Sequence, residues 1–334
     1  NESTSYSEQY VTTGNKYSGS AGSNISGNRM VSALLGIRWR IDGNTFLNLS
    51  GNFGWNSSDN TNISRQITFD TNPGINANAP FEGIDSVSDD IKLNGNEMRS
   101  LSSNGTNQYS VSTELTRRVN RKGSSLSFIL QTTGSKGENR YFTRSTTTYY
   151  RLKNQTGGDS ILYRNQYSAS PMESRRQSVG ILFTHPLSKK LRVQMSYNLN
   201  YQSQRNDRNT YDLSVFSDDA DSSIGYLPPN YGTGYTDSLS NRSHSRMLGH
   251  EFGLRFNYSD KVWNVTIGML VQPQSRTIDQ KTGLLKVDTL MHSTDLRPSI
   301  TASWHKGKAM VRISYQGNTR QPSLSNLLSL TDNS

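Results

Sequence analysis

Hydrophobic and polar residues alternate one by one along several stretches of the chain, most regularly between residues 191 and 202. Leucine, valine, methionine and tyrosine occupy one side of this stretch, and arginine, glutamine, serine and asparagine occupy the other. A period of two residues predicts an extended strand with one apolar and one polar face. Residues 178–185 alternate in the same way, and only residues 186–190 separate the two stretches. The pair therefore predicts an antiparallel hairpin with a tight turn.

The same unit recurs along the chain. In the first example a strand over 30–41 is followed by Asp42-Gly43-Asn44, a turn sequence that tolerates positive φ, and then by a returning strand over 45–55. We expect ten strands in five hairpins, with short turns near residues 43, 121, 189, 260 and 306. The other segments are predicted to be long polar loops: 1–29 with a strand remnant around 6–13, 56–107, 137–173 with a further hairpin, and 203–247.

The composition is too polar for a soluble domain of this length with a large core. Only 31% of the 334 residues are hydrophobic, and the mean hydropathy is −0.73. A transmembrane β-barrel needs lipid-facing side chains only at alternate positions of strands of ~9–11 residues, so a low hydropathy is expected for it. No apolar run approaches the ~18–20 residues of a membrane helix. The predicted fold class is all-β, an antiparallel transmembrane β-barrel with short periplasmic turns and long extracellular loops.

Aromatic residues fall where the two interfaces of a lipid bilayer would lie. Trp39, Trp263 and Trp304 stand near the short turns, and Trp55 and Tyr201 would mark the opposite interface. The expected location is the outer membrane of a Gram-negative bacterium, with outer-membrane lipid as a partner. The net charge is +10, but many lysines and arginines lie at the short turns without a nucleic-acid-binding motif beside them. We therefore expect contact with water and lipid headgroups, and no nucleic-acid partner.

Several charged residues fall on the polar faces of the predicted strands. In a barrel these faces line the lumen, where the side chains are expected to be solvated, or to contact a plug domain or a solute. The lumen-facing candidates are Arg38, Arg40, Glu114, Arg192, Glu251, Arg255 and Arg312.

The sequence offers no catalytic or metal-binding pattern. It contains no cysteine, and its five histidines have neither the H-E-x-x-H spacing nor a G-x-S-x-G motif beside them. We therefore expect neither an enzyme nor a bound cofactor or metal.

The last twenty residues, YQGNTRQPSLSNLLSLTDNS, carry a more specific pattern. A strand ending in tyrosine runs into Arg-x-Pro-Ser, then a leucine-rich step and Asp-Asn-Ser. This resembles the TonB-dependent receptor superfamily, in the branch known as the outer membrane protein β-barrel family. The proline also suits a simple strand terminator, because it cannot donate a ladder hydrogen bond. The matching residues are Tyr315, Arg320, Pro322, Ser323, Leu327, Asp332, Asn333 and Ser334.

The resemblance implies uptake of a solute across the outer membrane. Receptors of this family enclose a plug domain within about 22 strands and work with an energising periplasmic protein. We therefore expect residues 1–334 to be part of one barrel domain within a natural product more than twice as long, with the plug before it and further strands after it. A surface lipoprotein is a further partner that we consider. Two alternatives stay open, a non-transporting barrel subunit of an envelope assembly and a soluble sugar-binding β-sandwich.

A short pattern of Asp, then Ser or Thr, then an aliphatic residue occurs in four of the polar segments. It resembles an O-glycosylation site of some Gram-negative bacteria, although strand starts after a polar tip explain it equally simply. The acceptor hydroxyls would be those of Ser86, Ser160, Ser238 and Thr289.

Overall fold

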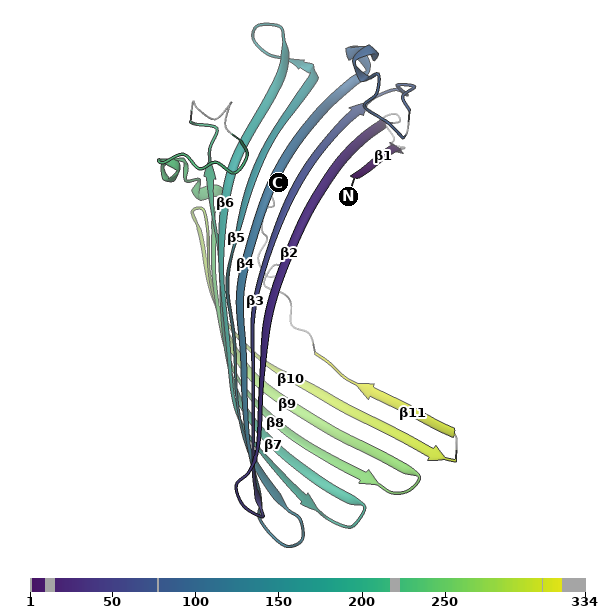
Figure 1. Cartoon of the computed structure of the whole chain (residues 1–334), viewed down its shortest axis with the longest axis vertical. Helices are drawn as coiled ribbons and strands as arrows, with labels where there is room; N and C mark the ends of the chain where they lie inside the picture. The colour runs from purple at the N-terminus through teal and green to yellow at the C-terminus, as the bar shows by residue number, and fades with distance from the viewer. Residues whose placement is uncertain (1, 10–15, 77, 217–222, 308, 320–334) are drawn as a thin grey trace.

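The computed structural model describes residues 2–9, 16–76, 78–216, 223–307 and 309–319. The strands in these ranges form one eleven-stranded sheet in which each strand pairs with the next along the chain. Every pairing is antiparallel. Figure 1 shows a single long, strongly twisted and curved layer, without a second layer packed against it. The prediction of an all-β antiparallel fold is confirmed, and the two-layered sandwich is not what the described strands form.

The strands are far longer than a bilayer requires. Those from β2 to β10 have between 19 and 29 residues, or roughly 60–95 Å at about 3.3 Å per residue. A tilted membrane strand needs only ~9–11 residues. The strands are β1 Glu2–Gln9, β2 Lys16–Arg40, β3 Thr45–Phe69, β4 Lys92–Arg118, β5 Ser125–Lys153, β6 Asp159–Pro186, β7 Leu191–Asp212, β8 Asn241–Ser259, β9 Trp263–Thr282, β10 Leu285–Lys306 and β11 Ala309–Gln316.

The five predicted short turns are confirmed, and they lie together at the lower end of the sheet in Figure 1. We call this the turn end and the opposite end the loop end. In the first turn, the carboxylate of Asp42 accepts hydrogen bonds from the backbone N–H of Asn44 at 2.7 Å and the hydroxyl of Thr45 at 3.0 Å. Local polar residues of this kind fix the tight reversals.

Most of the segments predicted as polar loops are strands, and this is the main correction to the sequence-based picture. Residues 1–29 contain β1 and most of β2, which makes eleven strands where ten were expected. The segment 56–107 is strand up to Phe69 and again from Lys92. Residues 56–62 and 102–107 are polar on both faces, so hydropathy does not alternate there, yet the backbone pairs with its neighbours. The hairpin predicted within 137–173 is confirmed.

The two long connections at the loop end cover the small buried core. Phe69 and Ile67 are buried beside the connection 70–91, and Tyr167 and Leu213 beside the connection 213–240. Short 3-10 helices stand in these connections: η1 Ile84–Ser86, η2 Asp89–Ile91, η4 Tyr231–Gly234 and η5 Asp237–Leu239. No helix in the described ranges is long and apolar enough to cross a membrane.

Candidate functional site

One face of the sheet carries an exposed apolar band near the turn end. Directly opposed residues of antiparallel strands share a face, so the register aligns one row across seven strands: Trp39, Leu47, Leu115, Phe128, Ile181, Tyr197 and Phe252. Leu47 and Tyr197 are half-buried, and the other five side chains of the row are exposed; Met195 of β7 is 52% exposed. Apolar side chains in this number need a non-aqueous neighbour.

The band has the height of a bilayer core. Trp39 of β2 pairs with Leu47 of β3. Trp55 lies eight residues beyond Leu47 in β3, on the same face. Leu47 to Trp55 covers nine residues of β3, against the ~9–11 residues of a tilted strand that crosses a bilayer. Near the turn end Trp263 and Trp304 face each other directly across β9 and β10. The aromatic residues thus stand at the two borders of the band.

The opposite face, which we call the polar face, carries all seven charged candidates. The register aligns Arg38, Glu114 and Glu251 in one row. The Glu251 carboxylate accepts a hydrogen bond from the Asn198 amide at 3.0 Å. Arg40 lies over the ring of Phe46, 5.7 Å from its centre. The remaining candidates are on the same face of β7, β8 and β11: Arg192, Arg255 and Arg312.

Arginines from three strands line a hollow of about 550 Å³ on the polar face. Arg255 of β8, Arg297 of β10 and Arg312 of β11 share it with Ser299, Thr301 and other neutral polar residues. Arg297 also forms an ion pair with Glu251 at 3.8 Å. Sequence reasoning missed Arg297 because Pro298 suggests a strand end, whereas β10 runs through this proline. A hollow of this charge favours carboxylate or phosphate groups.

The loop-end half of the polar face is uncharged over five strands. Its residues are Ser, Thr, Asn and Gln with a few Gly, Met, Leu and Tyr, and none is Asp, Glu, Lys or Arg. Most of it lies in segments that sequence reasoning predicted as loops. We call this surface the neutral wall; it consists of the alternate residues of Ser3–Ser7, Ser18–Gly36, Ser50–Thr68, Asn94–Ser112 and Gln131–Tyr149 that pair with one another across β1–β5.

The four predicted glycosylation residues all lie toward the loop end. Ser86 and Ser238 are exposed in η1 and η5, Thr289 is exposed in β10, and Ser160 begins β6 and is half-buried. The Ser86 hydroxyl donates to the carbonyl of Gly83 at 2.6 Å.

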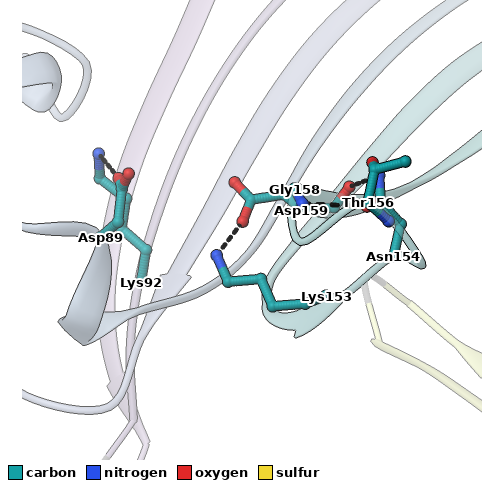
Figure 2. Close-up of polar contacts among 7 residues, drawn as sticks. All are labelled: Asp89, Lys92, Lys153, Asn154, Thr156, Gly158 and Asp159. Atoms are coloured by element: carbon teal, nitrogen blue, oxygen red, sulfur yellow. Dashed lines mark hydrogen bonds and ion pairs between the residues drawn. The ribbon is translucent and has the colours of Figure 1, made fainter.

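The β5–β6 turn beside Ser160 is held by its own side chains (Figure 2). The Asn154 amide oxygen accepts hydrogen bonds from the N–H groups of Thr156 and Gly158, both at 3.0 Å, and Lys153 pairs with Asp159. On the neighbouring connection Lys92 pairs with Asp89 at 2.8 Å. These contacts fix the shape of the turn and of the start of β4.

The connection 213–240 packs on the face that carries the apolar band. Tyr231 and Tyr235 contact Tyr211 of β7 with ring centres 5.1 and 5.7 Å apart, and Tyr231 also meets Tyr167 of β6. By register, Tyr167 and Tyr211 oppose each other on that face. Burial raises the pKa of the Tyr167 hydroxyl above its ordinary value. This connection therefore lies against the band-bearing side of the sheet, beyond the band.

Two of the histidines form hydrogen bonds with neighbouring strands and turns. His185 bonds Ser124 at 2.7 Å beside a short turn, and His250 bonds the Tyr197 hydroxyl at 3.0 Å. No group of three or more His, Cys, Asp or Glu suited to a metal occurs among the described residues. Of the family-like motif, Tyr315 lies in β11. Arg320, Pro322, Ser323, Leu327, Asp332, Asn333 and Ser334 lie outside the described residues.

Comparison with known proteins does not assign this chain to a family. No protein-family model matches the chain, and no curated protein matches it. Among solved structures, the translocator domain of the autotransporter NalP from Neisseria meningitidis is similar over 88% of this chain and 82% of its own, with 11% identity and a TM-score of 0.24. A TM-score this low does not support an inference about fold or function. An autotransporter translocator is also a different kind of barrel from the TonB-dependent receptors that the sequence resembles.

Proposed function

We propose that this chain forms part of the wall of a wide β-barrel in the outer membrane of a Gram-negative bacterium. The observation that carries the proposal is the exposed apolar band on one face, opposite a face with charged and amide side chains. Lipid covers the band, and water fills the space beside the polar face. The short turns lie on the periplasmic side, and the long strands project outside the cell.

Within this barrel, we propose uptake of a solute by the route that TonB-dependent receptors use. The polar face lines the path, a plug domain closes it, and an energising periplasmic protein releases the plug. The resemblance of residues 315–334 supports this assignment, as does the wide lumen that the long polar-face side chains require. A surface lipoprotein is a reasonable further partner at the loop end.

The barrel proposal is tested with single-cysteine spin labels in the natural protein, because this chain has no cysteine of its own to replace. Ile267 and Thr266 are adjacent in β9 and lie on opposite faces. In vesicles, a nitroxide at Ile267→Cys should be relaxed mainly by oxygen, which concentrates in lipid. A nitroxide at Thr266→Cys should be relaxed mainly by a water-soluble nickel chelate. Equal responses at the two sites would overturn the barrel.

The uptake proposal has a separate test. Cells that express the natural protein should show photocross-links from its periplasmic side to an energising protein, and these should disappear when the plug is deleted. Stable copurification with other envelope proteins, without any such cross-link, would favour the non-transporting assembly subunit instead.

A further inference from the structure

Within the stretches of β2 to β5 that contain the neutral wall, every charged residue lies on the opposite face. The register runs without a shift from Tyr17 to Arg40 against β3, and equally between β3, β4 and β5 across the neutral wall. The charged residues of the opposite face, beyond the band, are Arg29, Asp59, Arg65, Glu97, Arg99, Lys136, Glu138, Arg140 and Arg144.

This separation is not explained by contact with water alone. The neutral wall begins level with the apolar band, but most of it continues past the row of Trp55, where the opposite face carries charges. There a solvated surface would accept charged and neutral polar side chains alike. The band-bearing face uses its charges in ion pairs such as Arg65 with Glu97 and Arg140 with Glu138. The polar groups on the other face of the same strands are amides and hydroxyls. That face therefore excludes charged side chains but keeps neutral hydrogen-bonding ones.

The neutral wall is an ordered ladder of hydrogen-bonding groups. The Asn96 amide donates to the Thr147 hydroxyl across β4 and β5 at 2.9 Å. The hydroxyls of Ser5 and Ser20 meet at 2.7 Å, which extends the ladder to β1. Amides and hydroxyls each offer both donors and acceptors, and the sheet holds them at fixed spacing.

Some groups in this ladder have no protein partner. The amide oxygens of Asn56, Asn60 and Asn104 and the hydroxyl of Thr143 are buried without a hydrogen bond. All four belong to the neutral wall, and Asn104 pairs with Ser58, two residues along β3 from Asn56. A buried polar atom left without a partner is unfavourable. The side chains that carry them are only half-buried, so rotation of the amide or hydroxyl group would turn these atoms toward the polar face, where a ligand with hydroxyl groups would satisfy them.

We propose that the neutral wall binds an uncharged, hydroxyl-rich solute, a neutral oligosaccharide, on its passage through the lumen. A charged solute would leave water without meeting an opposite charge, and an apolar one would cover amides without hydrogen-bonding them. A linear sugar chain matches both the neutrality of the wall and its length along the strands. This inference rests on the proposed function, because it takes the polar face to line the lumen.

The test uses the natural protein in detergent on an array of linear neutral oligosaccharides (glucans, mannans, xylans and galactans) and acidic ones (alginate and polygalacturonate fragments). We expect retention of one or more neutral chains and none of the acidic chains. Asn56→Leu and Asn104→Leu should each weaken that binding roughly tenfold, the loss expected for a buried hydrogen-bonding group. Asn107→Leu, on the opposite face of β4, is the matched control and should leave binding unchanged.

Absence of binding to every neutral chain, preference for acidic chains or for unfolded peptides, or equal losses in Asn104→Leu and Asn107→Leu would overturn the inference. Heat-modifiable migration in gels shows in parallel that each variant is folded. A protein that passes the spin-label test but binds no neutral chain refutes only this inference. A protein that fails the spin-label test refutes the barrel itself.

Discussion

Replacing Met195 by arginine tests the assignment of the two faces most directly. Met195 lies within the apolar band, in a row with Phe183, Leu254 and Met269. It is 52% exposed, so the substitution removes little protein packing and its cost comes from what lies outside the sheet. Met195 is the third of the six band-side positions of β7 from Leu191 to Tyr201, so it lies near the middle of the apolar run of that strand. An arginine on the lipid face at such a depth costs roughly 2–4 kcal/mol. In water the same change on an exposed strand position would cost within about 0.5 kcal/mol.

The comparison variant is Asn198→Arg, three residues along the same strand and on the polar face. It loses the hydrogen bond from Asn198 to Glu251 at 3.0 Å, worth about 1 kcal/mol. The new guanidinium would lie beside the same carboxylate, which offsets part of this loss. The expected difference between the two variants is therefore about 2 kcal/mol, or up to thirtyfold in the folding equilibrium constant.

The assay is urea-dependent folding of the natural protein into phosphatidylcholine vesicles, followed by heat-modifiable gel migration. Met195→Leu controls for loss of the thioether and should behave like the unmodified protein. Equal destabilisation by Met195→Arg and Asn198→Arg, or a larger loss at Asn198, would refute the assignment of the lipid-facing side.

Three further outcomes are expected. The N–H groups of Trp263 and Val262 and the Tyr258 hydroxyl hold the pKa of Asp260 below its ordinary value; its stabilising effect is therefore present above pH ~4 and is lost as the pH falls further. Asp260→Asn should destabilise the protein at pH 7 and lose that effect in acid, as pH-dependent unfolding would show. A Val31→Cys, Val311→Cys pair should not cross-link in vesicles, because disulfide formation there would mean a small closed barrel. If the loops are glycosylated, intact mass should fall by a sugar on alanine substitution of Ser86, Ser160, Ser238 or Thr289, whereas a native mass equal to the bare polypeptide excludes it.

The fold at band level follows from the sequence. One face of each strand there meets a single apolar environment, so alternation such as Leu191 to Gln202 is uninterrupted and sets both strand and register. The short turns are equally visible, because Asp and Asn side chains hydrogen-bond to the nearby backbone, as Asp42 does with Asn44, and Gly adopts turn conformations at little cost.

The loop-end half of the sheet could not be predicted in this way. Segments such as 56–62 have polar residues on both faces, so the period-two signal is absent although the backbone is fully paired. Backbone pairing depends on the neighbouring strands and not on the side chains of one strand. The neutral wall was missed for the same reason, since its uniformity appears only when β1 to β5 are aligned in register.

The two unpaired edges of the sheet bear on the width of the barrel to which the sheet would belong. β1 pairs only with Lys16–Ser23 of β2, so at the level of the band one side of β2 has no neighbour among the described strands, and neither has the outer side of β11. Unpaired backbone groups in lipid cost several kcal/mol each. Pairing β2 directly with β11 would close a narrow barrel whose interior is filled by its own side chains. The polar face instead carries long arginines around a hollow of about 550 Å³, so we expect further strands, from this polypeptide or a partner, to widen the ring.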